Sequence, residues 1–319
     1  AKRAGIARVV TSAELEGLGG GSVPNPLPRR DPEPAARRAT RAACREGVPV
    51  LCAVSGRGGV GKTSLCALMG CLAGSWGMRV AALDLDLAFG NLYALCGLGR
   101  PADLSAVVSP GGLDAEALAA CAGHAFEGLE VWGPCGRPEY AERVQPMAEQ
   151  LIAGLTQEHD LVIVDTTTNW GDAVACAAQM ADRLLIVSDD RPGAVSTLVR
   201  CGALAVRLGV ARTRIVRLMN GCDVRHRDDS FIARAAVGLE CARELRVLDG
   251  GDEAVELLGQ GHAGELASTD NPLATSLAGG LAQLLRELGC LPDAARARKA
   301  LERVDRRGRG LLGRLREAS

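Results

Sequence analysis

Residues 56–63 constrain the fold of this chain more than any other feature. They read Gly-Arg-Gly-Gly-Val-Gly-Lys-Thr, which fits the pattern G-x-x-x-x-G-K-[ST] of a phosphate-binding loop. A short apolar run precedes the loop and a helix-length stretch follows it, and this strand–loop–helix context is the one that the motif requires. The sequence therefore predicts an α/β fold in which phosphate groups meet the start of a helix.

Each residue type in the loop has a physical role. The glycines let successive backbone N–H groups turn toward an anion, and the start of the next helix adds the positive end of its dipole. Lys62 would neutralise β- and γ-phosphate charge, and the Thr63 hydroxyl can bind Mg²⁺. We therefore expect nucleotide contacts from Gly56, Gly58, Gly59, Val60, Gly61, Lys62, Thr63 and Ser64.

Short apolar runs of strand length recur along the chain, and helix-length stretches separate them. The runs are residues 48–54, 80–86, 129–132, 161–165, 184–188 and 215–220. This alternation predicts an α/β fold with a mostly parallel sheet and helices on both faces. Only 3% of the residues are aromatic, which suits helices packed on a parallel sheet and disfavours an all-β fold.

Carboxylates stand where two of these runs end. Asp165 ends the run 161–165, at the position of a Walker B carboxylate that would hold Mg²⁺. Asp84 and Asp86 end another run, and alternation along an extended segment would put both on one side. We therefore expect either of them to reach the γ-phosphate region.

Composition divides the chain into three regions. Residues 1–47 are rich in Gly and Pro and start with Ala rather than Met, which indicates a linker or the remnant of an upstream region. Residues 48–290 form the predicted nucleotide-binding domain, and residues 291–319 form a basic C-terminal tail with helical spacing of apolar residues. The net charge of −1 combines two basic ends with an acidic middle, so we expect no nucleic-acid binding over the whole surface.

Further classes of site are disfavoured by spacing. Twelve cysteines are scattered with no C-x-x-C pair, which predicts neither a disulfide framework nor a zinc site and indicates a reducing cytoplasm. No apolar run approaches the ~18 residues of a membrane span.

The tail from residue 294 combines arginines with apolar residues at helical spacing, which are Leu301, Val304, Leu311, Leu312 and Leu315. It is therefore an anchor for an anionic membrane, a docking helix or a solvated tail.

The interior of the loop resembles a particular family. Residues 57–63 are similar to the deviant Walker A motif, K-G-G-x-G-K-[ST], of the MinD/ParA ATPases. Further stretches resemble the TadZ/CpaE group, which helps to localise and assemble Tad-type pili; they are residues 83–92, 133–142, 160–165 and 249–261. The resemblance covers about residues 48–290 and implies ATP and Mg²⁺ as ligands.

The resemblance also implies roles for single residues. Lys62, Arg57 and Asp86 would be catalytic, with Asp86 orienting the attacking water, and Asn220 would read the adenine edge. Arg57 replaces the lysine that in most relatives reaches across a dimer to the partner's phosphates, so slow hydrolysis is expected. Relatives often carry prolines where this chain has residues 166–169 and Leu248.

The function that the resemblance implies is an assembly switch. ATP bound between two subunits would stabilise a homodimer that localises or scaffolds a Tad-type pilus or secretion system, in the cytoplasm and peripheral to the inner face of the membrane. The alternative is a ParA- or MinD-like partitioning or positioning ATPase that acts on DNA or membrane. A tyrosine kinase on this fold would carry a C-terminal tyrosine cluster, but the tyrosines here are Tyr93 and Tyr140. An iron–sulfur reductase would need paired cysteines, and no paired spacing is found.

Overall fold

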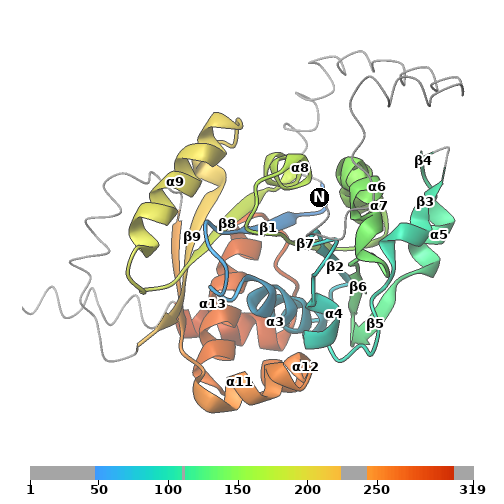
Figure 1. The fold of residues 1–319 in the computed structure, drawn as a ribbon. Helices are drawn as coiled ribbons and strands as arrows, with labels where there is room; N and C mark the ends of the chain where they lie inside the picture. The colour runs from blue at the N-terminus through green and yellow to red at the C-terminus, as the bar shows by residue number, and fades with distance from the viewer. Residues whose placement is uncertain (1–46, 110–111, 224–242, 305–319) are drawn as a thin grey trace, which may run out of the picture. The chain divides into compact units, whose positions relative to one another are not determined.

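The computed structural model describes residues 47–109, 112–223 and 243–304 (Figure 1). Residues 1–46 of the predicted linker and residues 305–319 of the predicted tail lie outside these ranges. The described part contains one large sheet, helices on both of its faces and a small two-stranded ribbon.

An eight-stranded sheet forms the centre of the domain, in the order β10-β9-β8-β1-β7-β2-β6-β5. Its strands are β1 (Val50–Val54), β2 (Val80–Asp84), β5 (Gly123–Phe126), β6 (Leu129–Trp132), β7 (Leu161–Asp165), β8 (Arg183–Ser188), β9 (Ile215–Cys222) and β10 (Arg243–Leu248). Neighbouring strands pair in parallel except at one edge, where β5 runs antiparallel to β6. The predicted α/β fold with a mostly parallel sheet is confirmed.

Helices cover both faces of the sheet, as Figure 1 shows. One layer contains α3 (Lys62–Ser75), α4 (Leu92–Leu95), α11 (Gly251–Gly259), α12 (Ala263–Ser268) and α13 (Pro272–Glu287). The other contains α5 (Ala115–Ala120), α6 (Ala141–Val144), α7 (Ala148–Glu158), α8 (Asp172–Met180) and α9 (Ala194–Arg207). The connections include the ribbon β3 (Val108–Ser109) and β4 (Gly112–Leu113) and the 3-10 turns η2 (Leu104–Val107), η3 (Pro138–Tyr140), η4 (Gln145–Met147) and η5 (Arg212–Arg214).

Strand β1 shows why the apolar runs in this sequence are continuous. Leu51 and Ala53 contribute to the core under the α3 layer, whereas Val50, Cys52 and Val54 contribute to the core under the α7–α9 layer. Successive side chains of a strand point to opposite faces, so a strand that is covered on both faces needs an apolar residue at every position.

Helix α3 is buried more completely than its sequence predicts. Its spacing indicates one apolar face formed by Leu65, Leu68, Met69 and Leu72 that packs on the sheet. In the structure every residue from Leu65 to Gly74 is buried, because α12 and α13 pack against the side of α3 that faces away from the sheet. The spacing identified one apolar face and made no prediction for the other sides of the helix, which these neighbouring helices cover.

Residues 295–304, at the start of the predicted tail, are helical. Ala297 and Ala300 are buried in the core that lies under the α3 layer, and Leu301 packs against it. Leu301 therefore contributes to the domain core rather than to a free apolar face. Leu311, Leu312 and Leu315 of the predicted anchor lie outside the described residues.

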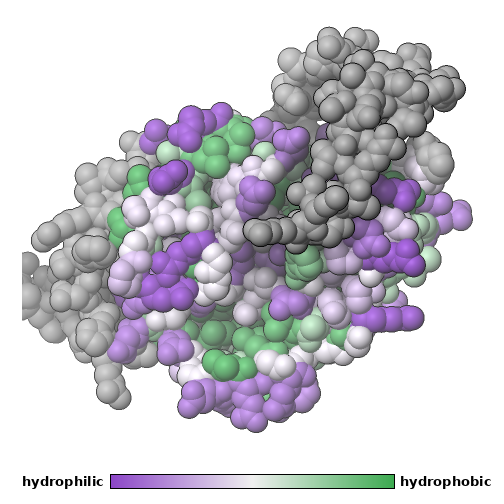
Figure 2. All heavy atoms as spheres, viewed as in Figure 1, coloured by the Kyte–Doolittle hydropathy of each residue, from purple (hydrophilic) through white to green (hydrophobic). Residues whose placement is uncertain are grey.

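On the face shown in Figure 2, hydrophilic and hydrophobic residues are intermixed. Among the described residues, Phe89 and Val255 are the large apolar side chains that are strongly exposed. The described cysteines are free thiols, and most of them are buried. No helix in residues 47–109, 112–223 and 243–304 has the length and apolar character that a membrane crossing requires.

Replacing Gly74 with alanine should destabilise the domain by about 2 kcal/mol, because a methyl group has no room between α3 and the β5–β6 connection. A Cβ atom at this position would lie 2.2 Å from the Glu127 carbonyl oxygen. Chemical denaturation of the wild type and the variant measures the difference in the free energy of unfolding. Gly259→Ala is the control, since a Cβ there meets no atom within 4 Å; an equal loss in both variants would contradict the steric argument.

Candidate nucleotide-binding site

The predicted site residues meet at one edge of the sheet. The loop at residues 55–61 follows β1, Asp84 and Asp165 end β2 and β7, and the segment from Ser188 and the residue Asn220 lie near the ends of β8 and β9. These strands run parallel, so their carboxyl ends lie at the same edge, and this is where α/β sheets bind ligands. Residues more than a hundred positions apart in the chain are thereby brought together.

The loop geometry leaves backbone N–H groups available for an anion. Gly59 and Gly61 have φ values of 72° and 88°, in the left-handed region that favours glycine. Gly61 is the N-cap of α3, and no side chain caps the first turn of this helix. A Cβ atom at Gly61 would also lie 2.4 Å from Asn220 Nδ2. The start of α3 therefore presents unpaired N–H groups together with the positive end of the helix dipole.

Thr63, Lys62 and Asp165 form the polar centre of the site. Asp165 is 1% exposed at the end of β7, and Lys62 is 9% exposed at the start of α3. Burial raises the pKa of Asp165 to about 6, while a hydrogen bond from Thr63 and the charge of Lys62 act in the opposite direction. A carboxylate in contact with a hydroxyl is a pair of hard oxygen donors, so these side chains fit Mg²⁺.

Asp84 has a different role from the one that strand alternation predicts. It is fully buried, and its two carboxylate oxygens accept hydrogen bonds from the backbone N–H groups of Asp86 (2.9 Å) and Leu92 (3.1 Å). Burial and the charge of Asp165 raise its pKa. A Cβ atom at Gly90 would lie 2.2 Å from Asp84 Oδ2, so the backbone wraps closely around this carboxylate. Asp84 thus holds the loop that carries Asp86.

Asp86 is the more accessible carboxylate of the two. Strand β2 ends at Asp84, so the extended segment does not continue to Asp86, and the side chain of Asp86 is partly exposed. Its Oδ1 accepts a hydrogen bond of 3.3 Å from the N–H of Phe89. The structure therefore separates two carboxylates that the sequence could not distinguish.

Asn220 contacts the phosphate loop through its amide nitrogen, while its amide oxygen accepts no hydrogen bond. Its Nδ2 donates a hydrogen bond of 2.9 Å to the Val60 carbonyl oxygen. Its Oδ1 is buried and has no hydrogen-bond partner. A buried acceptor without a partner is costly, and the exocyclic amino group of adenine is a donor that would satisfy it. The residue present at this position therefore fits an adenine nucleotide.

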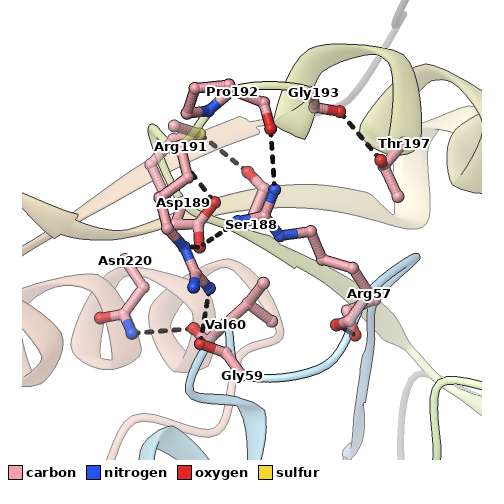
Figure 3. Close-up of polar contacts among 12 residues, drawn as sticks. Arg57, Gly59, Val60, Ser188, Asp189, Arg191, Pro192, Gly193, Thr197 and Asn220 are labelled. Carbon is pink, nitrogen blue, oxygen red and sulfur yellow. Dashed lines mark hydrogen bonds and ion pairs between the residues drawn. The ribbon is translucent and has the colours of Figure 1, made fainter.

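Arg57 is bound within its own chain. Its Nη2 lies 3.2 Å from Asp189 Oδ2 and its Nη1 donates a hydrogen bond of 3.1 Å to the Pro192 carbonyl oxygen (Figure 3). The guanidinium thus contacts the segment that follows β8. It remains partly exposed, with 27% of its side-chain surface accessible.

Two charged residues of the site, Asp189 and Arg191, were not found by sequence reasoning. Arg191 Nε donates to Asp189 Oδ2, and Arg191 Nη2 donates a hydrogen bond of 2.9 Å to the Gly59 carbonyl oxygen. The available signal was their position directly after the apolar run 184–188, because the end of that strand lies beside the end of β1. Trp170 was also missed; its Nε1 donates to the Ser55 carbonyl oxygen at 3.3 Å.

A groove adjoins the phosphate loop. Its volume is about 670 Å³, and it lies between the segment after β7 and the exposed side of α9. Its lining includes Gly56, Thr168, Trp170, Arg200, Leu204 and Arg207. The groove therefore places two arginines and a tryptophan directly beside the first glycine of the loop.

Residues 51–307 match the CobQ/CobB/MinD/ParA nucleotide binding domain, which is most of the chain. The chain belongs to this family. The finding confirms the predicted MinD/ParA relationship at the level of the family.

Individual members of the family show how close the relationship is. The chain is 32% identical over 162 residues to an uncharacterised ATP-binding protein of Methanocaldococcus jannaschii and 26% identical over 153 residues to the antiactivator FleN of Pseudomonas aeruginosa. These matches cover 49% and 47% of this chain and 58% and 53% of the two proteins, so the chain spans little more than half of their lengths.

A solved structure extends the comparison of the fold. The septum site-determining protein MinD of Pyrococcus horikoshii, complexed with Mg-ADP, superimposes with a TM-score of 0.62 at 18% identity. The match covers 75% of this chain and 98% of that MinD chain. The fold of this member of the CobQ/CobB/MinD/ParA family is therefore that of MinD.

Proposed function

We propose that the chain is an ATP-binding dimerisation switch that hydrolyses ATP slowly and localises or scaffolds the assembly of a Tad-type pilus or secretion system. The observation that carries the nucleotide part is the meeting of Lys62, Thr63 and Asp165 at the uncapped start of α3. Phosphoryl transfer needs positioning and charge neutralisation more than covalent chemistry, and these residues supply both.

In this proposal each residue acts on a defined part of the nucleotide. The N–H groups of residues 59–63 bind the phosphate oxygens, and Lys62 neutralises the β- and γ-phosphates. Thr63 and Asp165 hold Mg²⁺, which supplies positive charge to the phosphates when it is bound. Asp86, which is the partly exposed carboxylate of the β2 end, orients the attacking water. Asn220 Oδ1 accepts a hydrogen bond from the adenine amino group.

The switch itself depends on Arg57. In the single chain its guanidinium is paired with Asp189. We propose that in an ATP-bound homodimer it leaves this carboxylate and contacts the partner's phosphates, as the family resemblance implies. A nucleotide shifts an equilibrium toward the state that binds it more tightly, so ATP shared by two subunits favours the dimer. Arginine in place of lysine changes the geometry of this contact, which accounts for slow hydrolysis.

The pilus role rests on the resemblance of residues 133–142 and 249–261 to the TadZ/CpaE group. The partners would be proteins of pilus or secretion assembly in the cytoplasm.

A partitioning or positioning ATPase is the alternative function, and the similarity to a septum site-determining protein favours it. The acidic middle of the chain disfavours action on DNA. Action on an anionic membrane would use the basic tail, and liposome co-sedimentation of the full chain and of a chain lacking residues 305–319 separates this case.

Sedimentation velocity tests the switch. We expect the chain to sediment as a monomer without nucleotide and with ADP, and as a dimer with Mg²⁺ and a slowly hydrolysed ATP analogue. The expected change follows from ligand linkage, because a ligand that binds one assembly state more tightly shifts the population toward it. Identical sedimentation under all three conditions would refute the switch.

A further inference from the structure

We infer that Arg191 is a positioning residue of the phosphate cradle: it holds the Gly59–Val60 peptide with its carbonyl turned away from the nucleotide and its N–H turned toward it. The inference deepens the proposed nucleotide binding and rests on it. Arg191 lies outside the loop motif, and its effect is exerted through the backbone rather than by contact with the nucleotide.

Two consecutive carbonyls of the loop accept hydrogen bonds from side chains outside it. Arg191 Nη2 donates to the Gly59 carbonyl oxygen at 2.9 Å, and Asn220 Nδ2 donates to the Val60 carbonyl oxygen at 2.9 Å. The donors come from the ends of β8 and β9, which lie on one side of the loop. Figure 3 shows both side chains reaching these two carbonyls.

Peptide geometry sets the direction of the N–H groups of Val60 and Gly61. In a planar trans peptide the C=O and N–H bonds point in opposite directions. Within the described residues the Gly133–Pro134 bond is the cis peptide, so both peptides of the Gly59–Val60–Gly61 segment are trans. With their carbonyls held toward Arg191 and Asn220, the N–H groups of Val60 and Gly61 point to the opposite side. Neighbouring N–H groups that point the same way form an anion-binding concavity.

The two glycines give this segment conformational freedom. Gly59 and Gly61 both have positive φ, and glycine populates more backbone conformations than any other residue. The Gly59–Val60 and Val60–Gly61 peptides each adjoin one of these glycines, whose backbone freedom lowers the cost of rotating the peptide, and ordering it on ligand binding would consume binding energy. The two outside hydrogen bonds restrict this rotation before the ligand arrives.

Asp189 holds Arg191 in place. Its Nε donates to Asp189 Oδ2, and its backbone N–H lies 3.3 Å from Asp189 Oδ1. The side chain is 53% exposed, so without this carboxylate it would sample many rotamers. Asp189 is only 12% exposed and also contacts Arg57. Asp189 thus fixes the direction from which Arg191 reaches the loop.

The test compares Arg191→Ala with the wild type in the full chain. Isothermal titration with MgADP and NMR titration with adenosine measure binding with and without the phosphates. We expect about a tenfold loss of MgADP affinity, the effect of about one hydrogen bond to the loop, with adenosine affinity changed less than twofold. Arg296→Ala is the matched control, because Arg296 is an exposed arginine of the helix at residues 295–304 and the charge change is the same.

Three further readouts distinguish positioning from other effects. The ¹⁵N–¹H resonances of Val60 and Gly61 should shift in Arg191→Ala without ligand, while the thermal unfolding temperature stays within a few degrees of the wild type. The loss of MgADP affinity should persist from low to high salt, because a long-range charge effect would be screened.

Several outcomes overturn the inference. Unchanged MgADP affinity in Arg191→Ala would do so, as would an equal loss of adenosine affinity, an effect that disappears at high salt or an equal loss in Arg296→Ala. These results leave nucleotide binding by the wild type intact. By contrast, absence of MgADP binding to the wild-type chain would refute the proposed function and with it this inference.

Discussion

Replacing Lys62 with alanine is expected to weaken ATP binding at least about 100-fold, because truncating one partner of a buried charged contact costs several kcal/mol. Lys62 is 9% exposed and lies beside Asp165, at the start of a helix whose N–H groups have no side-chain cap. Without its ammonium group the phosphates would face the buried carboxylates Asp84 and Asp165 without the cation at the start of α3. Isothermal titration with MgATP measures the change.

The chain offers a matched control for this substitution. Lys299 is exposed in the helix at residues 295–304, and Lys299→Ala should bind MgATP as tightly as the wild type. Because Lys62 also compensates buried carboxylates, its loss can lower the stability of the domain, so the free energy of unfolding is measured for both variants. An affinity within threefold of the wild type in a folded Lys62→Ala protein would show that this loop does not bind phosphates as proposed.

Replacing Arg57 with alanine is expected to remove the ATP-driven dimer while the chain retains its ADP affinity within about threefold. Arg57 is bound to Asp189 and to the Pro192 carbonyl oxygen, so ADP binding by one chain does not depend on it. A dimer that uses Arg57 on the partner's phosphates should be weakened at least about 30-fold, as at an interface hot spot. Sedimentation equilibrium over a dilution series measures the dimer, and titration with MgADP measures the monomer.

Two variants control the Arg57 experiment. Arg57→Lys restores the residue of most relatives and should dimerise with ATP at least as well as the wild type. Arg200→Ala removes an exposed arginine of α9 from the neighbouring groove and separates the specific contact from net charge. If Arg57→Ala dimerises normally with ATP, the switch does not act through Arg57. If it loses ADP affinity as well, Arg57 serves binding within one chain.

The fold and the centre of the site could be predicted because their signals are local. The loop motif consists of consecutive residues, 56–63, and their types follow from the geometry of a strand, a tight glycine turn and a helix start. The apolar runs identify strands buried on both faces, and the parallel connections then bring Asp165 to the loop. The edge strands β5 and β10 escaped prediction, because strands such as Arg243–Leu248 alternate charged and apolar residues and their pairing on the sheet edge decides their structure.

The sequence by itself determined the α/β fold with its mostly parallel sheet, and it predicted that Lys62, Thr63 and Asp165 form the centre of a phosphate-binding site. Only the tertiary structure decided that Asp84 supports the backbone while Asp86 stays accessible, that α3 is covered on all sides, and that Asp189 and Arg191 hold Arg57 and Gly59. Local motifs are set by the conformations of neighbouring residues, whereas the covering of α3 and the contacts of Arg57 and Gly59 depend on segments that approach from more than a hundred residues away. For such contacts the order of strands in the sheet provides the information that residue types cannot.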